Sequence, residues 1–179
     1  MALEKLLRHK KSAIIKKWVH HVLETYPVDS KRFLIEQKDP FANPVGTTLS
    51  KEIAALYETF LEGMDADRLS PTLDRIIRIR AIQDFTPSQA VSFIFDLKRI
   101  IRSEIKGETR DLSGELPALE SSIDDLALLG FDIYMKCREK LYEINANEAK
   151  NRVSRLLRKA GLVCEIQNEE PFVREGNSL

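Results

Sequence analysis

The stretch IDDLALLGFDIYMKCREKLYEI, residues 123–144, carries a near-heptad apolar pattern. Its apolar residues recur mainly at steps of three and four, which is the period of one face of an α-helix. They are Ile123, Leu126, Gly130, Ile133, Tyr134, Cys137, Leu141 and Ile144. This spacing is typical of a helix that packs one face against another helix.

The helical pattern continues past residue 144 with a change of phase. The later apolar residues are Ala146, Ala149, Val153, Leu156 and Ala160, and Gly161 is a stop signal. An unbroken helix over residues 118–160 would be about 64 Å long, whereas a compact globule of this size has a diameter of roughly 40 Å. We therefore expect either a helix that extends beyond one globule or a break at Asn145 and Asn147.

The segments before residue 118 also read as helices. An apolar stripe over residues 2–26 predicts one helix that ends before Pro27, and Asp29 is a candidate cap for a short helix that follows. Asn43 and Pro44 then predict a helix start, because asparagine caps well and proline suits the first helical position.

Two further helices complete the pattern. Ser70 and Pro71 predict the start of one, and the capping box Thr86-Pro87-Ser88-Gln89 predicts the start of the other, which ends near residue 107. A single alternating segment, residues 162–166, is compatible with an edge strand or a frayed tail. The chain is therefore predicted to be all-α.

Length and composition indicate a single folded domain. The chain has 179 residues, of which 43% are hydrophobic and 31% charged, with seven glycines and seven prolines. Lys plus Arg and Asp plus Glu number 28 each, so the net charge does not favour nucleic acid or an anionic membrane. A basic N-terminal helix with an apolar stripe could lie on a membrane surface, but such a stripe is more often core.

Targeting features and cysteine chemistry point to the cytoplasm. The uncharged run at residues 85–95, which no other run exceeds in length, is too short to cross a bilayer, and the N-terminus lacks the organisation of a signal peptide. Cys137 and Cys164 lie far apart and have no metal-ligand spacing. We expect reduced thiols, no membrane insertion and a cytoplasmic protein.

No residue pattern predicts catalysis or a metal site. The three histidines, His9, His20 and His21, all lie in the first helical segment. His20 and Glu24 have a ligand-compatible spacing, but no third ligand accompanies them. The sequence also lacks a nucleophile paired with a base, so we expect no enzyme activity, no metal and no cofactor.

Two segments together resemble a known family. KDPFANPVG, residues 38–46, is followed by IRAIQDFTPSQAVSFIFDLK, residues 79–98. With the helix around Trp18 and the Tyr26-Pro27 pair, these resemble the N-terminal domain of RsbRD-type stressosome co-antagonists, over residues 3–145. The resemblance implies a single haem-free, globin-like domain of about six to seven helices that acts as a homodimeric sensor in bacterial signalling.

The absence of haem agrees with the residues, because a haem globin needs a histidine inside the fold and the chain has none after His21. Members of this family normally precede a STAS domain, but only 35 residues follow residue 144. We therefore expect residues 1–145 to form the sensor domain and residues 146–179 a helix extension and tail. The expected partners are a second copy and a separate STAS or kinase signalling protein.

Two candidate sites follow from this interpretation. The near-heptad face is longer than the surface that one globule can cover, so we expect a dimer interface there. Its candidate residues are Trp18, Ile123, Leu126, Ile133, Cys137 and Leu141. Alternatively, the chain is a small-molecule sensor in which Phe41 and Phe85 plug a junction beside Asn43 and Gln83, since polar groups beside aromatic ones are typical of ligand pockets.

Overall fold

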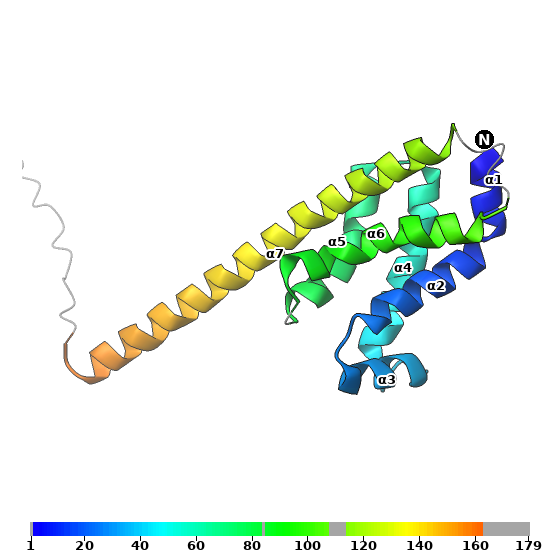
Figure 1. Cartoon of the computed structure of the whole chain (residues 1–179). Coiled ribbons are helices and arrows are strands. Elements are labelled where there is room, and N and C mark those ends of the chain that lie inside the picture. The colour runs from blue at the N-terminus through cyan, green and yellow to red at the C-terminus, as the bar shows by residue number, and fades with distance from the viewer. Residues whose placement is uncertain (1, 84, 108–113, 163–179) are drawn as a thin grey trace, which may run out of the picture. The chain divides into compact units, whose positions relative to one another are not determined.

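The computed structural model describes residues 2–83, 85–107 and 114–162, and the regular structure in these ranges is helical (Figure 1). The helices are α1 Ala2–His9, α2 Lys11–Glu24, α3 Val28–Glu36, α4 Pro44–Glu62, α5 Ala66–Ala81, α6 Pro87–Glu104 and α7 Leu116–Lys159. They confirm the predicted all-α class and the long last helix. Of the predicted strand at 162–166, all but residue 162 lies outside the described residues.

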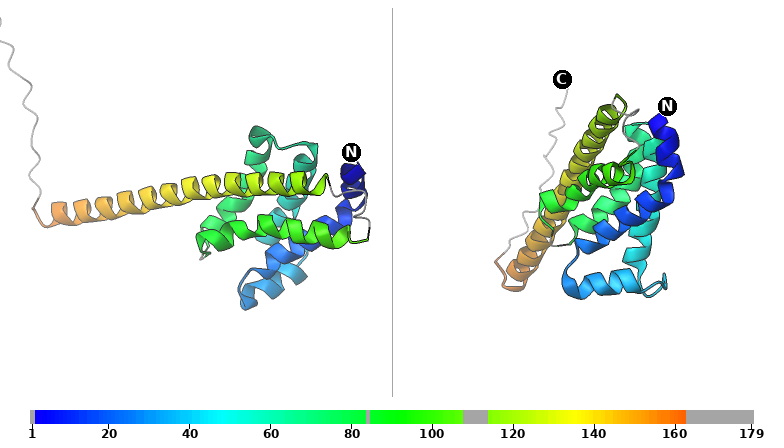
Figure 2. Two further views of the ribbon diagram at one scale, coloured as in Figure 1. Left: turned by 45° about the horizontal axis from the view of Figure 1, so that its top comes forward. Right: turned by 45° about the vertical axis from the view of Figure 1, so that its right-hand side comes forward.

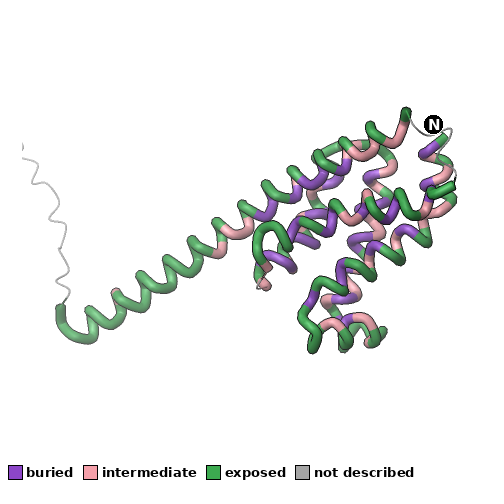
Figure 3. The backbone as a smooth tube through the Cα atoms, in the orientation of Figure 1, coloured by how far each residue is buried: buried purple, intermediate pink, exposed green. Residues whose placement is uncertain are grey.

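The chain divides into two compact units, residues 1–139 and 140–179. In the first, α2 packs against α3, α4 and α6, and α5 packs against α4 and α6 (Figure 2). Each helix there contributes side chains to one hydrophobic core, and Figure 3 marks the buried positions along the backbone. In the second unit, the described residues belong mostly to the end of α7 and are nearly all exposed.

The N-terminal segment forms two helices rather than the single helix predicted. Lys10 separates α1 from α2, and its backbone angles, φ −91° and ψ 6°, depart from helical geometry. The start of α1 is capped from a distance, because the Glu115 carboxylate accepts hydrogen bonds from the backbone N–H groups of Ala2 and Leu3 at 3.2 and 3.1 Å. This long-range cap fixes α1 to the beginning of α7.

The predicted helix starts at Asn43 and Thr86 are confirmed. Asn43 Oδ1 accepts a hydrogen bond from Gly46 N at 2.9 Å, and the Thr86 and Gln89 side chains form the reciprocal bonds of a capping box. A Cβ at position 46 would lie 2.5 Å from the Asn43 side chain, so glycine is required there.

Two other predicted starts are wrong. Helix α3 begins after Pro27, so Asp29 lies in its first turn instead of capping it. Helix α5 begins at Ala66, because Asp65 Oδ1 accepts bonds from the backbone N–H groups of Asp67 and Arg68. Pro71 therefore lies inside α5 and does not begin it.

Helix α7 continues without interruption through Asn145 and Asn147. Of the two alternatives left open by the sequence, the break is absent, and the helix ends before Gly161, which has a φ of +67°. This left-handed conformation suits glycine and stops the helix.

Trp18 anchors the core between α2 and α6. Its side chain is fully buried, and its Nε1–H donates a hydrogen bond to the Phe93 carbonyl at 2.7 Å. The Trp18 and Phe93 rings also stack, with centroids 6.1 Å apart. One side chain thus supplies both apolar burial and a buried hydrogen bond.

Replacing this side chain tests the packing. Trp18→Phe removes the indole N–H and part of the ring, so the free energy of unfolding should fall by about 1–3 kcal/mol. Thermal unfolding followed by circular dichroism measures the loss. Phe95→Leu, at an aromatic residue that is 46% exposed, is the matched control and should change the midpoint little. A Trp18→Phe midpoint equal to the wild-type value would contradict this account of the core.

The buried phenol of Tyr57 makes stability depend on alkaline pH. Its hydroxyl donates to the Leu7 carbonyl at 3.3 Å, and burial raises the pKa of Tyr57 above its ordinary value of 10.0. Tyr57 ionises more readily in the unfolded chain than in the folded one. The contribution of neutral, buried Tyr57 to the free energy of unfolding is therefore complete below about pH 10 and is lost as the pH rises above it.

Tyr57→Phe should therefore flatten the fall in stability above about pH 10. The measurement is the urea midpoint of unfolding as a function of pH. Some dependence should remain, because burial also raises the pKa of Tyr26. If the urea midpoint of Tyr57→Phe fell with alkaline pH as steeply as that of the wild type, the burial of Tyr57 would not be a cause of the pH dependence.

Candidate functional site

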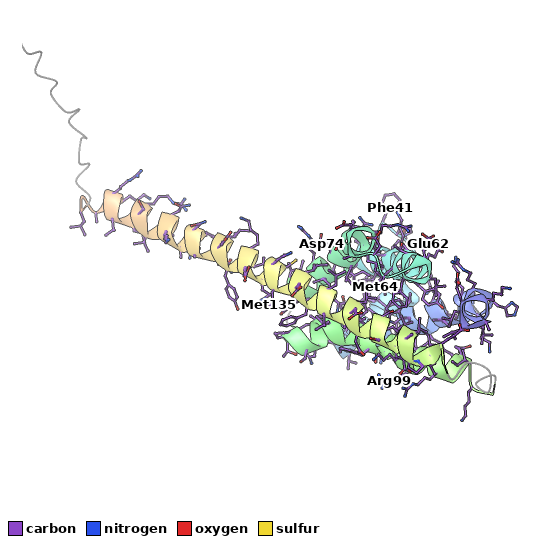
Figure 4. The ribbon with its side chains drawn as sticks, turned by 90° about the horizontal axis from the view of Figure 1, so that it is seen from above. Phe41, Glu62, Met64, Asp74, Arg99 and Met135 are labelled. Atoms are coloured by element: carbon purple, nitrogen blue, oxygen red, sulfur yellow. The ribbon has the colours of Figure 1, made fainter. Side chains whose placement is uncertain are left out.

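The structure does not bring the four predicted pocket residues together. Phe41 is 96% exposed and lies at the outer edge of the helical body (Figure 4). Asn43 is buried and caps both the start of α4 and the end of α3. Its Nδ2 donates hydrogen bonds to the carbonyls of Leu34 and Gln37, each at 3.0 Å. The prediction that Phe41 and Phe85 plug one junction is therefore wrong.

Phe85 instead packs against buried Arg80 at the end of α5. The Arg80 guanidinium carbon lies 4.3 Å from the centre of the Phe85 ring, and the Phe85 ring meets the Tyr26 ring edge-on at 5.2 Å. Aromatic rings attract a guanidinium through their quadrupoles. These contacts give Phe85 a structural role.

Arg80 is fully buried and joins three helical segments. Its Nε donates to the Ala90 carbonyl at 3.0 Å, its Nη1 to Thr25 Oγ1 at 3.1 Å and its Nη2 to the Gln89 carbonyl at 2.8 Å. Burial lowers the pKa of Arg80, while the nearby Tyr26 acts in the opposite direction. The sequence reading missed this residue, because an arginine in an amphipathic helix normally lies on the solvent face.

Gln83 lines an open pocket of about 420 Å³ beside this cluster. The other lining residues are Tyr26, Asp29, Ser30, Phe33, Leu34 and Val45. Tyr26 Oη and Gln83 Oε1 are buried and form no hydrogen bond of normal geometry within the described part of the chain. The Gln83 and Arg80 side chains nevertheless lie close enough to Tyr26 to oppose the rise of its pKa. Such atoms usually have a partner, which makes this pocket a candidate for a polar ligand.

A larger cleft, of about 620 Å³, lies between α1, the end of α4 and the start of α7. Its walls include Leu3, Leu7, Phe60, Leu61, Met64 and Leu119, and Glu4, Glu62 and Glu115 are among its polar lining residues. Its volume is within the range of small-molecule sites. Nothing in the sequence pattern predicted it, because its walls come from three distant segments.

The histidines lie away from the core. His9, His20 and His21 are all exposed, and His20 Nε2 lies 3.4 Å from a Glu24 carboxylate oxygen. Among the described residues, no cluster of three or more histidine, cysteine or acidic side chains is arranged to hold a metal ion.

Cys137 gives no sign of a reactive thiol. Burial raises the pKa of Cys137, and Asp74 acts in the same direction, so the nucleophilic thiolate is disfavoured. Cys164 lies outside the described residues.

The predicted dimer interface is largely core. Trp18, Ile123 and Leu126 are fully buried within one chain, and Ile133 is 8% exposed. These four side chains cannot contact a second copy without rearrangement, which corrects the prediction. The first half of the near-heptad face is covered by the helices of its own unit. Cys137 and Leu141 are half-buried.

A different face of α7 is uncovered. Leu128, Phe131 and Met135 are 66%, 45% and 40% exposed. Their spacing was visible in the sequence, but the buried face has the same spacing, so periodicity alone could not show which face lies outside. We call the exposed residues Leu128, Phe131 and Met135 the outer stripe.

The neighbouring helix α6 extends this apolar surface. Arg102 binds Glu120 at 2.7 Å and Lys98 binds Asp124 at 2.6 Å, so α6 and α7 run antiparallel. Continuing this register by one turn brings Phe95, which is 46% exposed, level with Leu128. Exposed apolar clusters of this kind often mark contacts with other proteins.

In the part of the chain that the structure describes, none of the helices is both long and apolar enough to span a membrane.

Comparison with known proteins adds a relative. Over 138 residues, the chain is 26% identical to a protein of Archaeoglobus fulgidus described as uncharacterized, and the match covers 75% of this chain and 82% of that protein. No solved structure matches the chain.

A family model matches residues 12–149, which include α2 to α6 and most of α7. The family is described as the RsbT co-antagonist protein rsbRD N-terminal domain, a family of stressosome-related signalling domains. The match includes the segments at 38–46 and 79–98 and confirms the resemblance drawn from them. The chain therefore belongs to the RsbT co-antagonist protein rsbRD N-terminal domain family.

Proposed function

We propose that this chain is a non-catalytic, haem-free sensory and regulatory domain that acts as a cytoplasmic homodimer in stressosome-related signalling. Family membership over residues 12–149 supports the signalling role. The observation that carries the homodimer is the outer stripe, whose large apolar side chains are 40–66% exposed along α7. A second copy of the chain would remove this surface from water.

The haem-free part of the proposal rests on the histidines. A proximal histidine must project from a helix into an apolar pocket. All three histidines of the chain lie instead on the exposed faces of the first two helices. A sensor built in this way would pass its signal through surfaces and association, not through an iron ligand.

The partner beyond the second copy is proposed to be a separate STAS or kinase signalling protein. This rests on the family's usual arrangement, in which the N-terminal domain precedes a STAS domain. The largest uncovered apolar surface described above lies on α6 and α7, so this region is the most suitable place for contact with other proteins.

An alternative function is small-molecule sensing. The observation that favours it is the pair of buried atoms without normal hydrogen bonds, Tyr26 Oη and Gln83 Oε1, beside an open pocket. A ligand with a hydrogen-bond donor and acceptor would satisfy both atoms after a small side-chain movement. This pocket replaces the predicted one around Phe41 and Phe85.

The homodimer is tested by sedimentation. The wild-type chain should sediment as a dimer, and Leu128→Glu should weaken dimerisation at least about 100-fold, because burying two unpaired carboxylates costs several kcal/mol. Phe41→Glu, at another exposed apolar residue, is the matched control and should remain dimeric. Leu126→Glu should unfold the chain, since Leu126 is core.

Two results would contradict the proposal. A wild-type chain that is monomeric at micromolar concentrations would exclude the homodimer. A Soret band in the visible spectrum of the purified protein would exclude the haem-free part.

The ligand alternative is tested by thermal shift against a panel of metabolites. A ligand present at 100 times its Kd adds about 2.7 kcal/mol to stability, so at least one compound should raise the midpoint. A ligand that binds at Gln83 should no longer raise the midpoint of Gln83→Ala. A ligand that binds in the cleft at Leu119 should still raise the midpoint of this variant. A panel in which no compound shifts the midpoint would favour the protein-contact function.

A further inference from the structure

The cleft between α1, the end of α4 and the start of α7 reaches the hydrophobic core. Its volume is about 620 Å³. Leu3, Leu7 and Phe60 line it although each of them is no more than 4% exposed. All the described lining residues lie between positions 3 and 122, so the cleft belongs entirely to the first unit.

The outer walls of the cleft are apolar and incompletely covered. Leu61, Met64 and Leu119 pack against the core but remain half-buried. Leu61 and Met64 come from the end of α4 and the connection to α5, where Figure 4 labels Glu62 and Met64. A cavity of this volume with mostly apolar walls is typical of small-molecule sites.

The charged side chains at the cleft already have partners within the chain. Glu4 pairs with Arg8 at 3.1 Å, and Glu62 pairs with Arg68. Glu115 accepts the two backbone hydrogen bonds that cap α1. The carboxylates that line the cleft are therefore compensated by cations or N–H groups of the same chain.

This pairing decides the charge of a suitable ligand. The remaining polar side chain among the described lining residues, Ser122, donates a hydrogen bond to the Ala118 carbonyl at 3.2 Å. A charged ligand would lose hydration in the cleft without finding an unpaired counter-ion among these residues. An uncharged, mostly apolar ligand loses little hydration and gains contact with Leu61, Met64 and Leu119.

Three helices that are distant in sequence meet at the cleft. Leu3 and Leu7 belong to α1, Phe60 belongs to α4 and Leu119 belongs to α7. A ligand that fills the cleft contacts all three helices, so its binding opposes local opening of α1. Binding therefore has an effect that can be measured at a defined place in the chain.

We infer that this cleft is a binding site for an uncharged, mostly apolar small molecule, with α1, α4 and α7 as its walls. The inference goes beyond the proposed homodimer. It also concerns a different cavity from the one beside Gln83, whose buried polar atoms suit a polar ligand.

Isothermal titration calorimetry with small amphiphiles tests the chemistry of the site. Octanol should bind about 4- to 15-fold more tightly than hexanol, because the two additional CH₂ groups are buried in the cleft. Octanoate and octyltrimethylammonium should bind at least about 10-fold more weakly than octanol, since neither ion gains an unpaired partner. Absence of octanol binding, equal binding of hexanol, or equally tight binding of either ion would overturn the inference.

A charge placed in the cleft tests its location. Leu119→Glu should weaken octanol binding at least about 10-fold, because the apolar ligand would then lie beside a carboxylate. The variant should fold, since Leu119 is half-buried and a carboxylate near the start of a helix suits the helix dipole. Leu128→Glu, the same change at an exposed position of α7, is the matched control and should keep the wild-type affinity. Unchanged octanol binding in Leu119→Glu would contradict the assignment of the site.

Hydrogen exchange of the wild-type chain locates the ligand without any substitution. Octanol at about nine times its Kd should slow exchange of the backbone amides of α1 by about 10-fold, because the opened helix has lost the site. The amides of α3 should be unaffected. Protection of α3 in place of α1, or loss of octanol binding in Gln83→Ala, would place the ligand in the pocket beside Gln83. Either result would overturn this inference and leave small-molecule sensing as a function, and neither readout depends on the homodimer.

Discussion

The fold of the first unit depends on the burial of one face of α7 against α5 and α6. Ile123, Leu126 and Tyr134 are almost completely buried there. Gly130 lets the backbone of α7 approach α6 closely, because a Cβ at this position would lie 2.8 Å from Ile94 Cδ1. Once this face is covered, the opposite side of α7 is left to solvent.

This division leaves an apolar surface of α7 uncovered. The helix has two apolar faces with nearly the same period, and its own unit can cover only one of them. The uncovered face within the first unit includes the apolar residues Leu128, Phe131 and Met135. The chain also belongs to a family of signalling domains.

The predictions that succeeded rest on local interactions. Asn43 and Thr86 cap their helices with bonds to residues three positions away, so short stretches of sequence contain everything that the cap requires. Two local predictions failed, because Pro27 and Asp65 rather than Asp29 and Ser70 precede their helices. Contacts between distant residues could not be predicted from single segments. The start of α1 is capped by Glu115, and Arg80 is buried by residues from α2 and α6, so neither could be read from its own segment.

The sequence by itself determined the all-α class, the long last helix and the family, because periodicity, capping residues and motif spacing are properties of neighbouring residues. Only the tertiary structure decided which face of α7 is core and which is exposed, and it separated Phe41 from Phe85. The physical reason is that two faces of one helix can have the same apolar spacing. Which one is buried depends on the shape of the helices that pack against it.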